Sequence, residues 1–317
     1  MRTQLGFADF TYFLSKFTFK KIDDPEILDR VTALGLTCYQ ASPAFDLPDG
    51  GKERRRILRR KADAAGITLI AAGYGDATVP LIEKALAATA EMGARVLRYA
   101  CGPMFVWKTP LPLPQFAETL AGAARIAERE GIPIAIENHQ DYTSEELEGV
   151  LRQVNSPWVG VWFDTGNSLA MLEDPLFTAR TLAPFAVGVH LKEYVVQAAA
   201  GGFDLVGVPM GEGVVDNPAV LAVLKDQFRY DTFYLTIENP LERCHIPALS
   251  PAYIAKFADR PMRDLGVIAR FIDASKAKNP DGVKPPHEAG LPEAECLAME
   301  QRTNEAAVAY ARRMLDL

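Results

Sequence analysis

Four short apolar runs constrain the fold of this chain most, because each ends on an acid or an imidazole. Each run is rich in valine, isoleucine and aromatic residues and is bounded by turn residues, which is typical of a strand buried on both faces. The runs are Ile132–Glu137, Val159–Asp164, Ala186–His190 and Phe233–Glu238. The sequence therefore predicts four buried strands, each with a chemically active side chain at its carboxyl end.

The spacing of these end residues predicts that the four strands are parallel. The steps between them are 27 (164 − 137), 26 (190 − 164) and 48 (238 − 190) residues. A strand, a loop, a helix and the next strand need such a length, so the carboxyl ends of the strands lie on one side, where ligands bind. A solvated loop position would explain any one of these residues. Four in succession make that explanation a poor one.

The four end residues have the composition of a site for one divalent metal ion. Three are carboxylates, Glu137, Asp164 and Glu238, and the fourth is His190. An oxygen-rich set with a single imidazole favours Mn²⁺, Mg²⁺ or Co²⁺ over Zn²⁺. We therefore expect one such ion at the carboxyl end of the strands.

An alternation of strands and helices runs through the first half of the chain as well. The expected strands there are Leu5–Phe7, Thr37–Ala41, Ile67–Ala72 and Arg95–Cys101. The expected helices are Asp24–Gly35, Lys52–Ala65, Pro80–Met92, Pro114–Glu130, Leu147–Val154 and, as the last barrel helix, Met262–Asp273. Together with the four later strands, this pattern predicts the α/β class and a (β/α)₈ TIM barrel. The arginine-rich run that begins at Arg54 is interpreted as the solvated outer face of a helix.

The composition changes after Ser275, and a domain boundary is expected there. Asn279–Pro292 is rich in proline and glycine and cannot be regular structure, whereas Glu293–Leu315 has a helical pattern. We expect a barrel over residues 1–275 and a proline-rich linker with a C-terminal helical arm over residues 276–317. The arm either packs back on the barrel or clasps another subunit. A closed barrel leaves it little to bury against, which favours a homo-oligomer, with a second small subunit as an alternative.

Composition limits the classes of partner. The chain has 317 residues, of which 49% are hydrophobic and 24% charged, with a net charge of −7. An acidic protein without a basic face is unsuited to nucleic acid.

No apolar run is long enough to span a membrane and no signal peptide is evident, so we expect a cytoplasmic protein. The four cysteines lie far apart and form no Cys-x-x-Cys pair, so the sequence suggests neither a disulfide framework nor a zinc knuckle. Small neutral or metal-chelating substrates fit best.

Four local motifs give the pattern a family resemblance. They are Asp164-Thr-Gly-Asn167, His190-Leu-Lys-Glu193, Pro209-Met-Gly-Glu-Gly-Val-Val-Asp216 and Ile237-Glu-Asn-Pro240. Over about residues 1–275 the chain resembles the xylose isomerase-like TIM barrel superfamily. Within it, the chain is most similar to the sugar isomerase/epimerase branch, with its ketose 3-epimerases, inosose dehydratases and catalytic subunits of C-glycoside deglycosidases. The resemblance implies that Glu137, Asp164, His190 and Glu238 bind one ion, Mn²⁺ by preference.

The resemblance also implies residues that contact the substrate. Lys192, Trp107 and Glu212, the last in a glycine-rich loop after the seventh strand, are expected at the substrate. Ketose 3-epimerases typically place a histidine three residues after the aspartate ligand, where this chain has Asn167. His139 stands two residues after Glu137, and residues two apart on a strand face the same way. If the strand continues, His139 therefore points into the same cavity.

The resemblance implies a metal-dependent sugar isomerase or epimerase. In such enzymes a carboxylate takes the proton alpha to the carbonyl of a keto-sugar, and the metal stabilises the enediolate. Glu137 and Glu238 would be base and acid. The alternative is a lyase that expels a group beta to the carbonyl of a keto-sugar or oxidised glycoside, with His139 as base.

Two further classes are less favoured by the sequence. The DNA repair endonucleases of the superfamily bind three metals with several histidines, and this acidic chain has only four histidines. A non-catalytic barrel that acts as a sensor or subunit would not need the intact set of four ligands.

Overall fold

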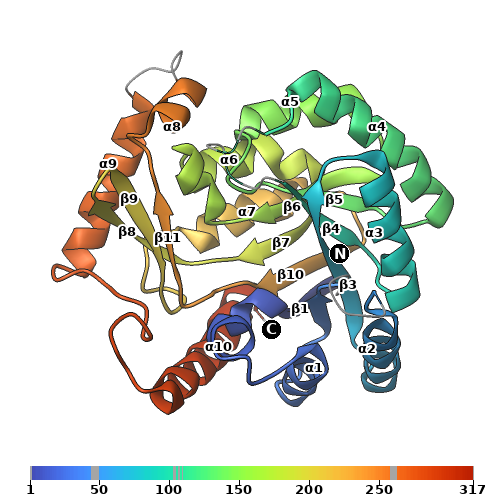
Figure 1. Ribbon diagram of the computed structural model, residues 1–317, viewed down its shortest axis with the longest axis horizontal. Coiled ribbons are helices and arrows are strands. Elements are labelled where there is room, and N and C mark those ends of the chain that lie inside the picture. Colours follow the sequence, from blue (N-terminus) through green and yellow to red (C-terminus); the bar gives the residue numbers. More distant parts are fainter. Residues whose placement is uncertain are drawn as a thin grey trace.

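Eight parallel strands close into a barrel in the computed structural model, which describes residues 2–43, 50–102, 105, 108, 110–257 and 263–316. β1 pairs with both β2 and β10, which closes the barrel (Figure 1). The barrel strands are β1 (Arg2–Ala8), β2 (Cys38–Ala41), β3 (Thr68–Asp76), β4 (Leu97–Gly102), β5 (Ile134–Glu137), β6 (Val159–Asp164), β7 (Ala186–Leu191) and β10 (Thr232–Ile237). The predicted (β/α)₈ barrel is confirmed.

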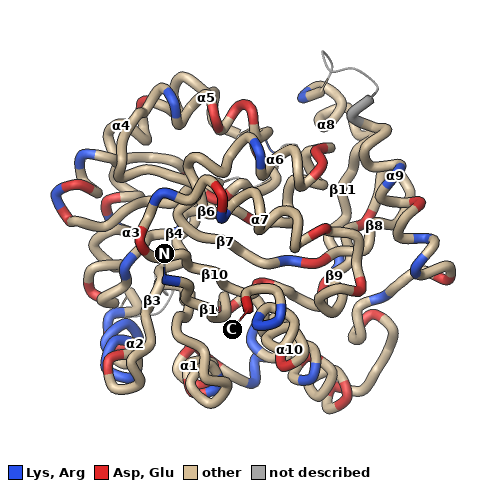
Figure 2. Tube along the Cα trace, turned by 180° about the vertical axis from the view of Figure 1, so that it is seen from behind, with Lys and Arg blue, Asp and Glu red and all other residues tan. Residues whose placement is uncertain are grey.

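Helices surround this barrel and follow the strands in the expected alternation. They are α1 (Asp24–Ala33), α2 (Lys52–Ala65), α3 (Val79–Met92), α4 (Leu113–Glu130), α5 (Ser144–Val154), α6 (Pro175–Leu182) and α7 (Asn217–Gln227). Local sequence sets their ends: α1 and α5 begin with capping boxes in which Asp23 pairs with Glu26 and Thr143 with Glu146. Arg56, Arg59 and Arg60 of α2 are exposed, whereas Arg55 is buried, so the predicted solvated face holds for only part of the run. Figure 2 shows the basic residues along α2.

A small antiparallel sheet stands beside the barrel and was not predicted. It has the order β11-β9-β8 and consists of β8 (Tyr194–Ala199), β9 (Gly202–Gly207) and β11 (Arg243–Ile246). α8 (Pro251–Lys256) and α9 (Arg263–Lys278) cover it on the same side of the molecule (Figure 1). Phe203, Leu205, Ile246 and Tyr253 form a core there that is separate from the barrel core.

The prediction that Met262–Asp273 is the last barrel helix was wrong about its position. The described part of that segment is helical as α9, but α9 packs against β8 of the small sheet. Ile268 of α9 belongs to the core of the small sheet, and Ser275 Oγ accepts a hydrogen bond of 2.8 Å from Val196 N. The apolar face of α9 is therefore used outside the barrel. Because the insertion after β7 offers that face an apolar sheet, a helix pattern alone could not place α9.

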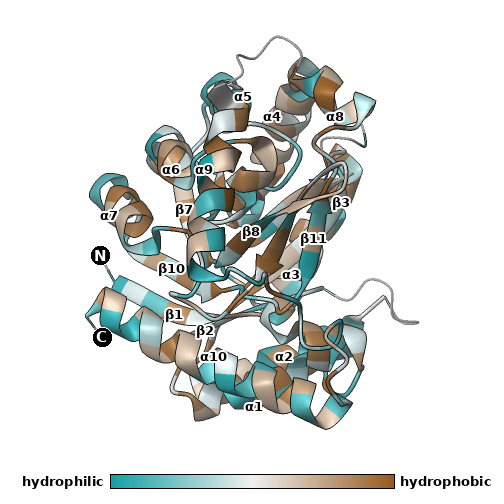
Figure 3. Cartoon of the chain, turned by 90° about the vertical axis from the view of Figure 1, so that its left-hand side faces the viewer, coloured by the Kyte–Doolittle hydropathy of each residue, from teal (hydrophilic) through white to brown (hydrophobic). Residues whose placement is uncertain are grey.

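The C-terminal helix α10 (Glu293–Leu315) takes a place on the barrel wall instead. Ala307, Val308, Ala311 and Leu315 are buried in the main apolar core. Figure 3 shows α10 beside α1, below β1 and β2. The arm thus packs back on the barrel, although a free arm that clasps another subunit was weighted more. With α9 on the small sheet, this face of the barrel was left for α10 to cover.

Two short helical segments complete the part of the fold that surrounds the carboxyl ends of the strands. They are the 3-10 helix η1 (Asp9–Tyr12) and the π-helix η2 (Phe13–Thr18). Glu300 of α10 accepts hydrogen bonds from Leu14 N at 2.7 Å and Ser15 N at 3.1 Å, and from Ser15 Oγ. Throughout the described residues, no helix is both long and apolar enough to cross a membrane.

Candidate metal centre

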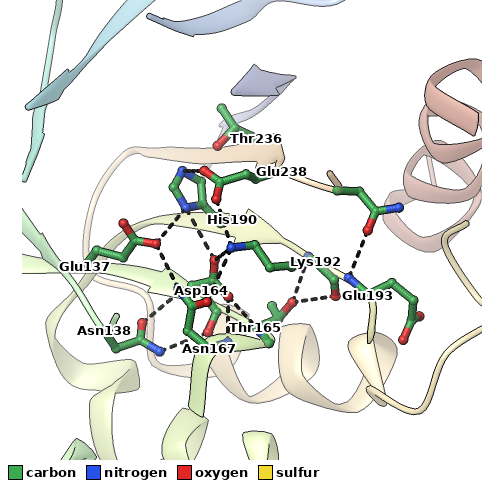
Figure 4. A network of polar contacts seen from close by, with 12 residues as sticks. Glu137, Asn138, Asp164, Thr165, Asn167, His190, Lys192, Glu193, Thr236 and Glu238 are labelled. Atoms are coloured by element: carbon green, nitrogen blue, oxygen red, sulfur yellow. Dashed lines mark hydrogen bonds and ion pairs between the residues drawn. The ribbon is translucent and has the colours of Figure 1, made fainter. Parts of the chain in front are cut away.

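The four end residues converge at the carboxyl end of the barrel. Glu137, Asp164 and His190 end β5, β6 and β7 or lie next to their ends, and Glu238 follows β10 directly. Figure 4 shows their side chains turned toward one another. One ligand atom from each residue lies within 4.8 Å of the others, and all four residues are buried. We call these four residues the tetrad.

His190 lies at the centre of the tetrad. Its Nδ1 atom is 3.4 Å from Glu137 Oε1 and 3.6 Å from Asp164 Oδ2, and its Nε2 atom is 3.2 Å from Glu238 Oε2. Gln40 Oε1, on β2, lies 3.0 Å from the same Nε2 atom. Burial opposes the charged imidazole, but the carboxylates of Glu238, Asp164 and Glu137 outweigh it and raise the pKa of His190.

Two cations accompany the three carboxylates of the tetrad. Arg98, on β4, forms an ion pair with Glu137. Lys192 Nζ lies 2.8 Å from Asp164 Oδ2 and 2.9 Å from Glu238 Oε1. With the imidazole of His190 neutral, as a metal ligand must be, the carboxylates outnumber the cations by one (3 − 2), in a buried place where unpaired charge is strongly unfavourable. Either a proton on His190 or a bound ion would compensate the third carboxylate. This oxygen-rich donor set fits a divalent metal ion, and the tetrad could hold one.

Neighbouring polar groups fix the orientation of the tetrad carboxylates. Asn167 Nδ2 donates to Glu137 Oε1 at 3.1 Å, while Gly166 N and Asn167 N donate to Asp164 Oδ1 at 2.8 and 2.9 Å. Asn138 exchanges two hydrogen bonds with the backbone of Asp164, which joins β5 to β6. Such contacts orient ligand side chains before an ion arrives.

A cavity of about 530 Å³ opens beside the tetrad. Polar side chains of Arg98, His139, Asn167, Lys192 and Glu238 line it on the barrel side. Aromatic rings line other parts, namely those of Phe10, Phe17, Tyr74 and Phe105. A cavity of this size with a few convergent polar groups is typical of a small-molecule site.

A second charged cluster lies in the wall of the same cavity. It consists of Asp9, Lys16, Asp24, Tyr39 and Arg54. Lys16 forms ion pairs with both aspartates, Arg54 lies 2.9 Å from Asp24 Oδ2, and Tyr39 Oη donates to Asp24 Oδ1 at 2.8 Å. Every carboxylate of this cluster therefore has a cationic partner.

The expected substrate residues are only partly gathered at the cavity. Asn167, Lys192 and His139 line it. β5 ends at Glu137, so the strand alternation does not extend to His139, although its half-buried side chain still borders the cavity. Trp107 lies outside the described residues.

Glu212 corrects another expectation, because it is exposed and does not line the cavity. Glu193 fixes the loop that contains Glu212, because it accepts hydrogen bonds from Gly211 N at 3.1 Å and Val215 N at 3.0 Å. Gly211 packs near Tyr310 of α10. These contacts hold the loop against α10, and Glu212 stays in solvent.

Most of the residues that line the cavity were not predicted from the sequence, among them Gln40, Arg98 and Glu242. Gln40 and Arg98 are polar residues inside otherwise apolar strands, which is a usable signal. Glu242 has no such signal, because it precedes a strand of the unpredicted small sheet.

The closed barrel and the buried tetrad place this protein among the α/β barrels, whose ligands bind at the carboxyl ends of the strands. The chain belongs to the xylose isomerase-like TIM barrel family, whose model matches residues 28–257. The resemblance seen in the sequence is thereby confirmed.

Two curated relatives match part of the chain. An uncharacterised protein of Escherichia coli (strain K12), YihM, is 25% identical over 143 residues, which cover 45% of this chain and 43% of the relative. The 3-oxo-isoapionate decarboxylase of Pectobacterium atrosepticum is 27% identical over 104 residues, or 32% of this chain and 38% of the relative. The chain thus spans less than half the length of either protein.

Solved structures match almost the whole barrel. The D-psicose 3-epimerase of Clostridium cellulolyticum H10 has a TM-score of 0.59 at 17% identity, covering 86% of this chain and 98% of its own. The IolI protein, solved with a zinc atom, has a TM-score of 0.58 at 14% identity, covering 87% and 99%. At such low identity these likenesses show the fold alone.

Proposed function

We propose that the protein is a divalent-metal-dependent isomerase or epimerase of a keto-sugar. The observation that carries this proposal is the buried tetrad, with its ligand atoms within 4.8 Å of one another beside a cavity of sugar size. The fold shared with a D-psicose 3-epimerase supports the choice of substrate class. The donor set favours Mn²⁺, with Mg²⁺ or Co²⁺ as alternatives. Cytoplasmic location and assembly as a homo-oligomer remain predictions.

The tetrad places one glutamate on each side of the imidazole. Glu137 lies next to Nδ1 of His190 and Glu238 next to Nε2. When bound, the ion supplies Lewis-acid stabilisation of negative charge on the carbonyl oxygen. One glutamate takes the proton from the carbon alpha to the carbonyl, and the other returns a proton from the opposite face, which inverts that carbon. Both glutamates would thus act as catalytic residues and as metal ligands.

Lys192 and Asn167 are suited to hold the substrate oxygens. Lys192 lies between Asp164 and Glu238 and lines the cavity, so its ammonium group can stabilise an oxyanion that forms there. Asn167 contacts Glu137 through its amide and also lines the cavity, where it can orient a hydroxyl group.

Deuterium exchange tests the proposal directly. The purified protein is incubated in D₂O with a panel of ketohexoses and 3-keto-glucosides, with and without added Mn²⁺. We expect deuterium to enter the carbon next to the carbonyl in the presence of the ion, and a chelator to stop the exchange reversibly. Absence of exchange from every substrate, or exchange that a chelator does not change, would contradict the proposal.

A second candidate is a lyase acting on the same class of substrate, and the Arg98–Glu137 ion pair favours it. Burial disfavours the Glu137 carboxylate, but Arg98 and His190 outweigh burial and lower its pKa, so Glu137 is a weak base. His139 lines the cavity outside the tetrad and can take the proton instead. His139→Gln should then retain the ion and lose about 10²–10⁴ in rate. A variant with unchanged turnover would leave the glutamates as the bases.

A further inference from the structure

The cavity contains one carboxylate that the proposed proton transfer does not use. Glu242 stands four residues after Glu238 and directly before β11. It lines the cavity together with its neighbours Lys192, Tyr194 and Cys244. Gly207 N, at the end of β9, donates a hydrogen bond of 2.9 Å to Glu242 O. This bond ties the residue to the small sheet and fixes where its side chain starts.

Glu242 differs from the other acids that line the described part of the cavity. Asp9 pairs with Lys16, Asp24 pairs with Lys16 and Arg54, and Glu238 pairs with Lys192. Among the described residues, the Glu242 carboxylate has neither a hydrogen bond nor an ion pair. It is therefore the cavity acid whose oxygens remain available to a bound substrate.

The surroundings of Glu242 keep its proton exchangeable near neutral pH. Burial raises the pKa of Glu242 to about 7, Lys192 acts against this rise and Glu238 adds to it. A group with a pKa near the working pH serves best as a general acid, because it is protonated often enough and still releases its proton readily.

Glu242 also lies on the side of the cavity that His139 borders. Cys244 Sγ lies 3.6 Å from Gln140 Oε1, so β11 touches the loop that follows β5. Glu242 stands two residues before Cys244, His139 stands directly before Gln140, and both line the same cavity. Neither belongs to the tetrad. A substrate whose carbonyl is held at the tetrad would present its other carbons to this side.

We propose that Glu242 is a catalytic acid that protonates the leaving oxygen of a keto-sugar or oxidised glycoside carrying an oxygen substituent beta to its carbonyl. This inference rests on the proposed function, because removal of the proton alpha to the carbonyl must come first. It names the acid that an elimination at this site, the second candidate function, would need.

The step is balanced without an oxidant or a reductant. The base takes the alpha proton, and the electron pair of the broken carbon–hydrogen bond forms the enolate. The enolate electrons then form a carbon–carbon double bond as the bond from the beta carbon to oxygen breaks. The departing oxygen takes its pair and the proton of Glu242, and an unsaturated ketone and an alcohol or water result. The base then releases the alpha proton to solvent, and solvent returns a proton to Glu242, so no net proton is consumed.

Two substrates with different leaving groups test this role. A methyl 3-keto-glucoside loses methoxide, which needs a proton, whereas the matching 3-keto-glucosyl fluoride loses fluoride, which needs none. Alpha-proton exchange in D₂O, methanol release, fluoride release and metal content are measured for the wild type, Glu242→Gln and the matched control Glu212→Gln, whose glutamate is exposed outside the cavity.

We expect Glu242→Gln to lose about 10²-fold or more in methanol release, the range of one general acid. Its metal content, alpha-proton exchange and fluoride release should stay close to those of the wild type, and Glu212→Gln should change none of the four. Should Glu242→Gln not fold, Glu242→Asp replaces it and should slow methanol release more than fluoride release.

Three outcomes would overturn the inference. They are wild-type exchange without elimination, undiminished methanol release by the variant, and equal loss with both leaving groups. Failure of the wild type to exchange the alpha proton would instead contradict the proposed function and, with it, this step.

Discussion

The tetrad and the second charged cluster border one cavity and use the same residue types, yet their charges are arranged differently. In the second cluster Lys16 and Arg54 face two aspartates, Asp9 and Asp24, so cations and carboxylates are equal in number. In the tetrad the three carboxylates face two permanent cations, Arg98 and Lys192, and the third is compensated only by a proton on His190, which a bound ion would replace. Both clusters are largely buried, so burial does not separate them.

Charge balance separates a ligand site from a structural network. A buried network that is neutral as it stands gains nothing from a further ion, because each charge is already compensated. A cluster with surplus carboxylate is stabilised by an additional cation, and the single imidazole among oxygen donors suits a divalent metal ion. The proposed ion therefore fits the tetrad, and the second cluster fits a structural role.

Removing the imidazole of His190 should have the largest effect on metal binding and activity. His190→Ala leaves three neighbouring carboxylates without their central ligand, so we expect loss of the bound ion and about 10³-fold or more of the exchange rate. Elemental analysis of the purified variant, together with the exchange assay, measures both. Full metal occupancy at wild-type rate would show that the tetrad is not the metal site.

Removing the lysine of the second cluster should give the opposite result. Lys16→Met leaves the buried Asp9 without its cation, and we expect a loss of about 3 kcal/mol in the free energy of unfolding. Metal content should not change, because no tetrad residue contacts Lys16 in the described structure. Denaturant unfolding and elemental analysis check the two parts. A variant that unfolds like the wild type but has lost its ion would reverse our assignment of the clusters.

Glu300 shows a third way to stabilise a buried carboxylate. Its oxygens accept hydrogen bonds from backbone N–H and hydroxyl groups. Glu300→Gln keeps the size of the side chain but turns an amide group toward Leu14 N or Ser15 N. We expect a loss of about 2 kcal/mol in the free energy of unfolding, because a buried donor loses its acceptor. Gln301, half-buried on the same helix, provides a control in Gln301→Ala, which should change stability less.

Asp141 extends the comparison to a buried acid whose negative charge is avoided by protonation of the carboxyl group. Burial raises its pKa from 3.8 to about 8. Between these values the folded protein retains a proton that the unfolded chain has lost, so stability falls as the pH rises through this window. Asp141→Asn should remove that decrease, so that it differs little from the wild type near pH 4 and is more stable than the wild type at pH 8. Unfolding at both pH values measures this, and parallel pH profiles would contradict it.

The strand ends were predictable because buried parallel strands leave a strong local signal. The runs that end on Glu137, Asp164, His190 and Glu238 are apolar on both faces, and a polar residue at such an end stands out. Arg98 was missed because only the three-dimensional pairing of β4 with β5 brings it to Glu137. β11 could not be placed because it pairs with β9, about forty residues earlier in the chain, whereas β8 and β9 form a local hairpin, which the predicted alternation of strands and helices did not include.

Helix placement was the other limit of prediction from sequence. The patterns of α9 and α10 show that each has an apolar face, but they do not say which surface that face covers. The presence of the small sheet decides the answer, and that sheet is itself a product of the tertiary fold.

The position of α10 links the order of synthesis to the shape of the substrate site. α10 emerges from the ribosome after every other described element, yet its Glu300 holds the backbone of Leu14 and Ser15, next to the cavity residues Lys16 and Phe17. Until that helix docks, the N-terminal wall of the cavity lacks these backbone contacts. A nascent chain is therefore expected to pair its barrel strands before the wall of the cavity is complete, while the apolar surface that α10 covers is still exposed.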